Sequence, residues 1–326
     1  MPSAPPDPSA PPRPTVAAVV VSHRRPVLLA AALDGLAAQT RPADLVVVVD
    51  NASGDGSAEV ARAHALAPEV LELARNTGGA GGFAAGLARA LARGADLVWL
   101  MDDDTVPTPG ALERLLAARA AHQGRAVLWA SRAVWTDGRD HPMNTPRERP
   151  LVDAATRARA AAAGALPVRS ASFVALLVDG AAVRARGLPV ADYFIWNDDF
   201  EFTTRLLRDA EGLFVPGSVV EHRTRTFGST DADPGERFAY EVRNKLWLFG
   251  RSSALRPLER VLYAGSTLRR WVRTVRRSSD RPTLLRAGAR GLRDGLRHGP
   301  RPTAEVLAGL GLDEDLRALA RPGGRA

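Results

Sequence analysis

The feature that most constrains the fold is the regular alternation of apolar runs and helix-like segments between residues 15 and 104. The runs TVAAVVVSH, DLVVVVD, EVLELARN and DLVWLMDDD have the length and apolar character of buried strands. The segments between them, such as PVLLAAALDGLAAQ and GGFAAGLARALARGA, carry apolar residues at helical spacing. Strands that alternate with helices predict right-handed crossovers and a mostly parallel, doubly wound α/β sheet. Ligands of such sheets bind at the carboxyl ends of the strands.

Polar side chains follow each of these four strands. A single Asp or Asn in such a position commonly caps a helix or forms an Asx-turn. Because all four positions fall on one edge of the predicted sheet, we expect them to form a ligand site. The residues are Ser22 after the first strand, Asp50 and Asn51 after the second, Asn76 after the third, and Asp102, Asp103 and Asp104 after the fourth.

Three consecutive carboxylates at the end of a buried strand repel one another unless a cation lies among them. Mg²⁺ and Mn²⁺ prefer oxygen ligands and commonly bridge carboxylates to the phosphates of a substrate. We therefore expect two or three of the carboxylates of Asp102, Asp103 and Asp104 to bind one of these two metals together with a phosphorylated ligand. Asp103, in the middle, is expected to point away and to be the most replaceable of the three.

A second acidic cluster lies in NDDFEFTTRL, at the start of a predicted helix. Glu201 and Arg205 are spaced as an i,i+4 ion pair, which leaves Asp198 and Asp199 free for another role. His222 follows a further apolar strand, GSVVEH, and an imidazole is a suitable additional ligand for a Mn²⁺ site that already holds carboxylates.

The Gly-rich turn NTGGAGGFAAG lets the backbone approach a ligand at Gly78 and Gly79, and the helix N-terminus that follows favours a phosphate. A Gly-x-Gly-x-x-Ala pattern that begins at Gly79 also fits an NAD(P)-dependent oxidoreductase, although the turn does not follow the first strand. A nucleotidyltransferase that uses the same metal carboxylates, with Arg24 and Arg25 at the phosphates, is a second alternative.

The charge of the chain is concentrated towards its C-terminus. The formal net charge is +8, and residues 251–300 contain thirteen arginines against three acids. We interpret this segment, with Trp271 among LRRWVRTVRR, as a helix at an anionic membrane surface. A nucleic-acid partner is not expected, because the acidic edge of the sheet would repel phosphates.

The composition, with 45% hydrophobic and 25% charged residues, is typical of a globular protein, and no apolar run approaches the roughly 18 residues of a membrane span. The Pro-rich opening lacks the features of a secretory signal, so we expect a cytoplasmic location, peripheral at the inner face of the plasma membrane. The predicted organisation is a disordered tail at 1–14, a catalytic domain at 15–238 with halves at 15–124 and 125–238, and a helical basic region at 239–326.

Six segments, in this order, resemble the family 2 glycosyltransferases of the GT-A fold over about residues 15–250. They are VVVSHRRP, VVDNASGDGS, NTGGAGGFAAGL, the triple Asp, NDDFEFTTRL and VVEHRT. NTGGAGGFAAG, HPMN and VRNKLWLF look most like bacterial rhamnosyl- and galactofuranosyltransferases of cell-wall or surface polysaccharide synthesis. The resemblance implies a UDP- or dTDP-linked sugar donor and a glycan or polyprenyl-linked acceptor.

The resemblance also implies roles for individual residues. Asp199 would be the base of a single, inverting displacement, with Asp198 beside it, and the metal would be held by Asp102, Asp104 and His222. The residues expected at the nucleotide sugar are Ser22, Asp50, Asn51, Asn76, Gly78, Gly79, Asp102, Asp103 and Trp196, the last as an apolar wall for a sugar ring. Asn197 stands where this motif frequently has Gly, so the register of the second acidic cluster rests on Glu201 and Arg205.

Overall fold

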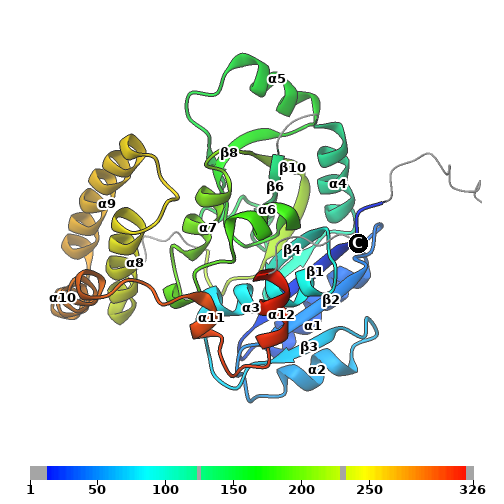
Figure 1. Cartoon of the computed structure of the whole chain (residues 1–326), viewed down its shortest axis with the longest axis horizontal. Helices are drawn as coiled ribbons and strands as arrows, with labels where there is room; N and C mark the ends of the chain where they lie inside the picture. Colours follow the sequence, from blue (N-terminus) through cyan, green and yellow to red (C-terminus); the bar gives the residue numbers. More distant parts are fainter. Residues whose placement is uncertain (1–12, 123–125, 228–232, 321–326) are drawn as a thin grey trace, which may run out of the picture.

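A central mixed sheet organises the protein, whose computed structural model describes residues 13–122, 126–227 and 233–320 (Figure 1). Within these residues the sheet has ten strands in the order β3-β2-β1-β4-β9-β6-β10-β8-β7, with β5 paired to β10. The strands are β1 (Val16–Ser22), β2 (Leu45–Asp50), β3 (Glu69–Glu72), β4 (Leu97–Asp102), β5 (Thr105–Pro107), β6 (Ala126–Val134), β7 (Arg147–Glu148), β8 (Leu166–Ser170), β9 (Leu176–Asp179) and β10 (Glu211–His222).

Helices cover both faces of this sheet and continue beyond it at the C-terminal end of the chain. They are α1 (Pro26–Ala37), α2 (Ser57–Ala63), α3 (Gly78–Ala92), α4 (Ala111–Ala121), α5 (Ala154–Ala162), α6 (Gly180–Arg186), α7 (Asp198–Leu206), α8 (Phe238–Gly250), α9 (Pro257–Arg277), α10 (Arg281–Arg297), α11 (Thr303–Val306) and α12 (Asp313–Ala320), with short 3₁₀ turns η1 (Ala191–Tyr193) and η2 (Gly235–Arg237).

The first four strands form the parallel half of the sheet that the alternating pattern predicts. β1 pairs in parallel with both β2 and β4, and β2 pairs in parallel with β3. Every residue of β1 is buried, because both faces of the strand are covered by helices. Alternate side chains of β1 enter two separate cores: Val19 packs with α3, and Val20 packs with α1 and α4.

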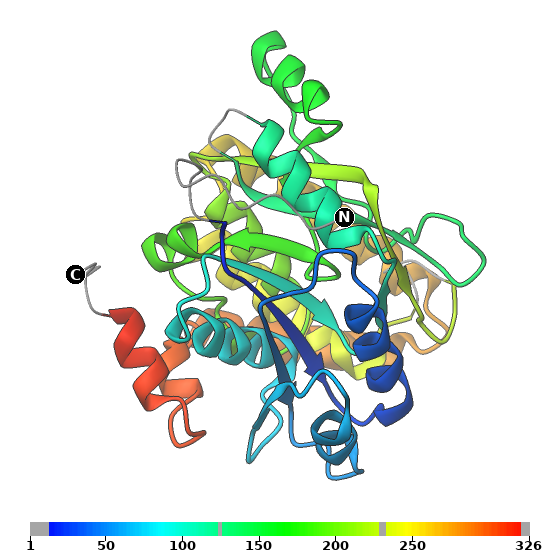
Figure 2. The same ribbon diagram turned by 90° about the vertical axis from the view of Figure 1, so that its right-hand side faces the viewer.

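The two layers are visible when the molecule is turned by 90° (Figure 2). The first strands lie between α1 on one side and α3 with α12 on the other. The fully buried Trp99 of β4 lies in the core on the α1 side, whereas Phe202 of α7 lies in the core on the α3 side. The α/β class with a mostly parallel sheet is therefore confirmed.

The second half of the sheet adds antiparallel strands that the sequence pattern did not reveal. β9 lies between β4 and β6 and is antiparallel to both, whereas β10 runs parallel to β6. The register of β10 shifts between Val215 and Val219, and this irregularity precedes the end of the strand at His222. Strands of two to five residues, such as β7 and β9, carry too little periodicity to be recognised from sequence alone.

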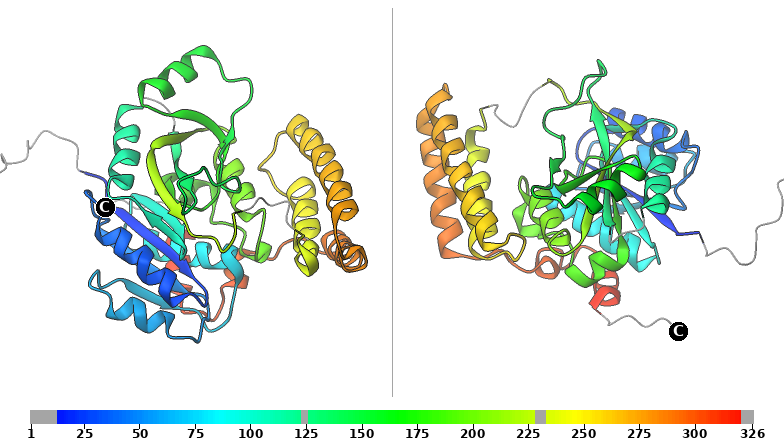
Figure 3. Two further views of the ribbon diagram at one scale, coloured as in Figure 1. Left: turned by 180° about the vertical axis from the view of Figure 1, so that it is seen from behind. Right: turned by 90° about the horizontal axis from the view of Figure 1, so that it is seen from above.

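The C-terminal region is helical, as predicted. α8, α9 and α10 stand together at one side of the sheet in views from behind and from above (Figure 3). The chain then returns to the catalytic core, where Leu307, Leu310 and Leu312 lie in the same apolar cluster as the inner face of α3. The predicted boundary after residue 238 stays a prediction, and most of the predicted N-terminal tail, residues 1–12, lies outside the described residues.

Replacing Leu307 by alanine tests whether the end of the chain stabilises the catalytic core. Leu307 is fully buried in the cluster shared with α3, so Leu307→Ala is expected to lower the free energy of unfolding by about 2–5 kcal/mol. Leu296→Ala, at an exposed leucine of α10, should change the free energy by less than about 0.5 kcal/mol. Urea denaturation measures both, and equal stability of the two variants would contradict this packing role.

Candidate active site

The carboxyl ends of the parallel strands bring the predicted polar residues to one edge. In the sheet register, Ser22 is opposite Asp50, and Asp102 is opposite Val21. Ser22, Asp50 and Asn51 are buried, and Asp102 is partly exposed. These side chains belong to different loops but share one small region, because parallel strands end at the same level of the sheet.

Asp103 does not point away from this region, so that expectation is wrong, whereas its replaceability stays a prediction. Its carboxylate accepts hydrogen bonds of 3.0 Å from the Ser22 hydroxyl and from the backbone N–H of His23. Burial raises the pKa of Asp103 to about 6, although these two hydrogen bonds and Arg25 oppose that rise. Asp103 therefore links the loop after β4 to the loop after β1 by hydrogen bonds.

Asp102, Asp104 and His222 lie close enough together to hold a metal ion. One ligand atom from each lies within 4.8 Å of the other two. His222 Nε2 is 3.1 Å from Asp104 Oδ1, and that buried oxygen accepts no hydrogen bond from any described residue. Arg25 contacts the other oxygen of Asp104 and lies 3.3 Å from Asp103. Arg25 thus supplies positive charge to this carboxylate cluster, a role that its position in the sequence did not indicate.

The orientation of His222 is set by a residue from the HPMN loop. The Asn144 side-chain oxygen is 2.8 Å from His222 Nδ1, and the Asn144 amide nitrogen donates to Ser172. This contact places the proton of a neutral imidazole on Nδ1 and leaves Nε2 facing the carboxylates. Sequence reasoning missed Asn144, because it lies 78 positions from His222 in an irregular loop.

The two outer carboxylates of the triple Asp have opposite electrostatic environments. Burial and the neighbouring charges of Asp104 and Asp103 raise the pKa of Asp102 well above its usual range. Burial alone would also raise the pKa of Asp104, but His222 and Arg25 outweigh it and hold that pKa below its usual value. The cluster therefore combines one carboxylate that is kept ionised with one whose ionisation would be favoured by an added cation.

The loop after β2 organises the Gly-rich turn. Asn51 accepts from the Thr77 backbone N–H at 2.9 Å and donates to the Gly78 carbonyl at 2.8 Å, while the Asn76 side chain accepts from the Gly78 N–H at 2.7 Å. Asp50 accepts a hydrogen bond from the Ser53 N–H, and its other oxygen is buried without a hydrogen-bond partner among the described residues. Asn51 and Asn76 are thus tied to the turn, and Asp50 retains an unused acceptor.

The second acidic cluster opens α7 beside the first. The predicted Glu201–Arg205 pair is present at 2.9 Å, and both partners are largely buried. Burial and the charge of Asp199 raise the pKa of Asp198 to about 8, and Asp198 in turn raises the pKa of Asp102. Because the interaction between two charges weakens with distance, this effect indicates that the start of α7 lies near Asp102.

Asp199 is more exposed than Asp198 and accepts a hydrogen bond of 2.6 Å from the Phe200 N–H. Burial raises its pKa, but this hydrogen bond and the cations Lys245 and Arg147 act in the opposite direction. Of the two carboxyl groups, Asp199 is therefore the one whose ionised form is supported by neighbouring positive charge.

The segment that precedes these aspartates has a strained backbone. Phe194, Trp196 and Asn197 all have positive φ angles of 64–65°, which are unfavourable for residues with a side chain. The buried amide nitrogen of Asn244, on α8, lies 2.8–2.9 Å from the carbonyl oxygens of Tyr193, Ile195 and Trp196. Such strain persists only where surrounding contacts enforce it, so Asn244 holds the segment that presents Trp196, Asp198 and Asp199.

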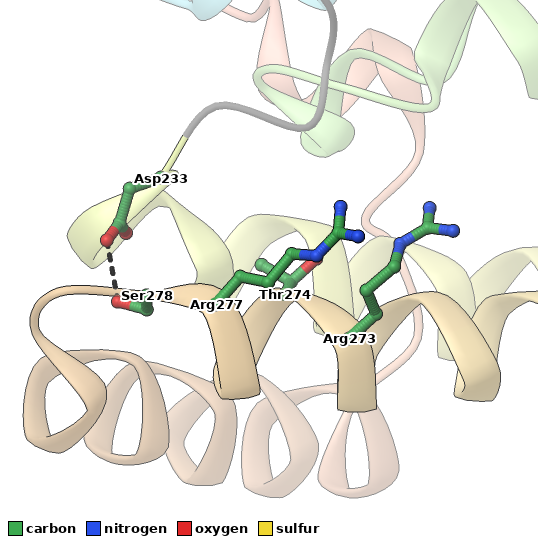
Figure 4. A pocket seen from close by; sticks show the side chains of 5 residues that line it. All are labelled: Asp233, Arg273, Thr274, Arg277 and Ser278. Carbon is green, nitrogen blue, oxygen red and sulfur yellow. Dashed lines mark hydrogen bonds between the residues drawn. The ribbon is translucent and has the colours of Figure 1, made fainter.

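A small pocket elsewhere in the molecule contains none of these residues (Figure 4). It lies between α9 and the segment before η2, and Ser278 donates a hydrogen bond of 2.6 Å to Asp233 at its rim. The pocket is therefore separate from the carboxylate edge of the sheet.

Comparison with known proteins shows the family of this chain. A family model described as glycosyl transferase family 2 matches residues 17–180. The chain is a family 2 glycosyltransferase. It is 36% identical over 249 residues to the galactofuranosyltransferase GlfT1 of Mycobacterium tuberculosis, and the match covers 71% of this chain and 81% of GlfT1. The predicted enzyme class is thereby confirmed, and the oxidoreductase and nucleotidyltransferase alternatives are excluded.

Solved structures with the same fold come from this class of enzyme. Residues 1–349 of Staphylococcus aureus TarS, in complex with UDP-GlcNAc, match with a TM-score of 0.58 and 15% identity over 84% of this chain and 79% of that one. The chain spans 43% of the longer TarS chain. The mannosyltransferase PcManGT from Pyrobaculum calidifontis, in complex with GDP-Man and Mn²⁺, matches with a TM-score of 0.53 and 20% identity over 97% and 88% of the two chains. These similarities confirm the GT-A fold.

Gly78 and Gly79 provide a matched test of the Gly-rich turn. Gly78 has φ +69°, and a Cβ atom there would lie 2.0 Å from the Phe194 carbonyl oxygen, whereas a Cβ atom at Gly79 would meet nothing within 4 Å. We expect Gly78→Ala to lower the free energy of unfolding by at least about 1–3 kcal/mol and to displace the strained segment. Gly79→Ala should leave stability within about 1 kcal/mol of the wild type. Thermal and urea denaturation distinguish the two, and an undisturbed Gly78→Ala protein would refute the close approach to Phe194.

Proposed function

We propose that this glycosyltransferase transfers galactofuranose from a UDP-linked donor to a hydroxyl of a cell-envelope glycan or its polyprenyl-linked precursor. The observation that carries the proposal is the Asp102, Asp104 and His222 group at the carboxyl edge of a chain that is 36% identical to a galactofuranosyltransferase. Rhamnose from a dTDP-linked donor is the competing sugar, since the sequence motifs also resemble rhamnosyltransferases.

The donor diphosphate is proposed to bind with a divalent metal, Mn²⁺ or Mg²⁺, at Asp102, Asp104 and His222. The fit of these residues to such an ion is supported by the unused buried oxygen of Asp104 and by the imidazole nitrogen that Asn144 directs towards the carboxylates. A bound metal would offset the negative charge that develops on the leaving diphosphate. Arg25, which already lies at two of the carboxylates, supplies additional positive charge at the same place.

The nucleoside and sugar parts of the donor are assigned to the loops around this site. Asp50, with an acceptor oxygen left free by the protein, is proposed to accept a hydrogen bond from the base or ribose. Asn51 and Asn76 shape the turn that exposes Gly78 and Gly79, while Ser22 and Asp103 hold the adjoining loops together. Trp196, in the strained segment, is proposed to contact the sugar ring.

Asp199 is proposed to be the base of a single inverting displacement. It accepts the proton of the acceptor hydroxyl as that oxygen bonds to the anomeric carbon, and the bond from this carbon to the diphosphate breaks on the opposite face. Asp198, with a pKa of about 8, is largely protonated at neutral pH and is less suited to this role. Lys245 and Arg147 favour the ionised form of Asp199, as a base requires.

A screen of nucleotide sugars with the wild-type protein tests the proposed reaction. UDP-galactofuranose is expected to bind in a Mn²⁺-dependent manner and to be hydrolysed slowly without an acceptor, and EDTA should abolish both effects. The release of UDP and free sugar is measured by chromatography. Preferential consumption of a dTDP-linked sugar would replace the proposed donor, and consumption of neither would contradict the proposal.

Two substitutions separate the proposed roles of the acidic clusters. Asp199→Asn should lower kcat for transfer by about 10²- to 10⁴-fold with little change in donor Kd, because it removes only the base. Asp104→Asn should weaken Mn²⁺-dependent donor binding by at least about tenfold. The exposed Asp209, just beyond the same helix as Asp199, provides a control in Asp209→Asn. Full transfer by Asp199→Asn would rule out its role as the base.

We further propose that α9 and α10 rest on an anionic membrane surface. None of the helices in the described ranges combines the length and the apolar character needed to cross a bilayer. Of the thirteen exposed large apolar side chains among the described residues, however, eight lie on these two helices: Leu258, Val261, Leu262, Leu268, Val272, Leu285, Leu292 and Leu296. On each helix they recur at helical spacing, so they form one face.

Arginines accompany this apolar face, as an interfacial helix requires. Arg269 and Arg276 fall on the same side of α9 as Leu262 and Val272, and each such cation contributes about 1 kcal/mol near an anionic lipid surface. A location beside the membrane would bring the site to a lipid-linked acceptor.

Flotation with liposomes tests the proposed membrane contact. Val261→Ser combined with Leu262→Ser should reduce association with vesicles of phosphatidylglycerol and phosphatidylcholine at least about tenfold, because both side chains are exposed on α9. Val27→Ser, at an equally exposed valine of α1, is the matched control and should float like the wild type. Truncation after Gly250 is unsuitable, since it also removes Leu307 and Leu312 from the core. Equal flotation of all variants would exclude the proposed face.

A further inference from the structure

Lys245 is the single lysine of a chain with 43 arginines, and it lies buried near the proposed base. It belongs to α8, and its side chain is almost fully enclosed: the residue is 6% exposed. The ammonium nitrogen lies 4.8 Å from the ring centre of Phe200 and 5.9 Å from that of Phe249. Among the described residues it has no hydrogen bond or ion pair with any carboxylate, carbonyl or hydroxyl group. Burying an ammonium group without a hydrogen-bond or ion-pair partner costs free energy, unless a ligand supplies that partner.

Glu241, the acidic residue nearest to Lys245 along α8, already has hydrogen-bond partners. Glu241 accepts hydrogen bonds from Asn197, Arg270 and the indole N–H of Trp271, so both of its oxygens have partners. Burial lowers the pKa of Lys245 to about 8, with Arg270 and Arg147 adding to the effect and Glu241 and Asp199 opposing it. The positive charge of Lys245 is therefore only weakly compensated by the protein.

A second cation shares the same aromatic ring. The guanidinium carbon of Arg147, on β7, lies 5.3 Å from the ring centre of Phe200 and 5.9 Å from that of Tyr263. Arg147 is exposed and forms no ion pair with any described residue. Two cations thus meet at one phenylalanine, and Asp199 is the adjacent carboxylate that both of them influence. The local charge remains positive by one unit when Asp199 is ionised.

The position of these cations relates them to the acceptor. Phe200 directly follows the proposed base, and Tyr263 of α9 packs edge-on against it with ring centres 5.2 Å apart. Arg147 therefore lies where Phe200 meets Tyr263 of α9, and α9 also carries the exposed Leu258 and Leu262. The nucleotide part of the donor is assigned to the triple Asp at the end of β4, whereas the two cations belong to α8 and β7. An anion bound here would belong to the molecule that supplies the attacking hydroxyl.

We propose that Lys245 and Arg147 form a subsite for an oxyanion carried by the acceptor, a phosphate ester of a lipid carrier or a carboxylate of an acidic sugar. The Lys245 ammonium, a compact point charge on a flexible stem, lies near the rings of both Phe200 and Phe249 and can turn its three donors towards a bound anion. Arg147 is exposed and completes the subsite from the solvent side, because a guanidinium can donate to two oxygens of one anion. This inference rests on the proposed function.

The single lysine makes a direct test possible. Biosynthetic ¹³C,¹⁵N-lysine labelling gives one side-chain signal, whose pH titration is followed by NMR in the full-length protein. The probes are octyl phosphate, methyl glucuronide and the uncharged octyl glucoside. We expect one of the two anions to shift the Lys245 signal and to raise its midpoint above the value of the free protein, because a bound anion favours the charged form. A response to octyl phosphate alone assigns the lipid carrier, and a response to methyl glucuronide alone assigns an acidic sugar.

Two arginine variants determine whether the response is specific. Arg147→Met retains the lysine signal and should weaken binding of the responding anion by about tenfold. Arg317→Met removes an exposed cation of α12 and should leave affinity within about twofold of the wild type. No shift with either anion, an equal shift with octyl glucoside, or equal losses in the two variants would overturn the subsite. Hydrolysis of UDP-galactofuranose by the wild-type protein, measured separately, distinguishes this outcome from failure of the proposed function.

Discussion

The structure depends on how negative charge is balanced at the carboxyl edge of the sheet. Three consecutive aspartates end β4, and α7 adds two more carboxyl groups to the same region. In the protein alone, Arg25 offsets part of this charge, and burial keeps Asp198 in its protonated form at neutral pH. A divalent metal ion would neutralise the negative charge that remains. The same carboxylates that destabilise the fold by repelling one another can therefore bind the metal and, with it, the donor diphosphate.

A second constraint links the helical region to this edge. Asn244 holds the carbonyl groups of a segment in which Phe194, Trp196 and Asn197 adopt unfavourable backbone angles. The same helix supplies Lys245 beside Phe200. α8 therefore contacts the segment that precedes Asp199 and does more than connect the sheet to the basic helices.

The C-terminal helices carry two sets of side chains that composition alone does not separate. One set of side chains packs inward, including Leu307 in the cluster beneath α3, and another faces outward with arginines between apolar residues. The arginines of residues 251–300 therefore differ in their environment. Arg270 forms an ion pair with Glu241 within the helical group, whereas Arg269 and Arg276 lie on the outward face of α9.

The sequence by itself determined the first half of the sheet, the two acidic clusters, the Glu201–Arg205 pair and the family, because periodicity, strand ends and i,i+4 spacing are local properties. Only the tertiary structure decided that the buried Asp103 links two loops by hydrogen bonds. It also decided that Asn144 orients His222 and that Asn244 holds the strained segment. These contacts join residues 48 to 81 positions apart, and no local pattern encodes which distant loops will meet.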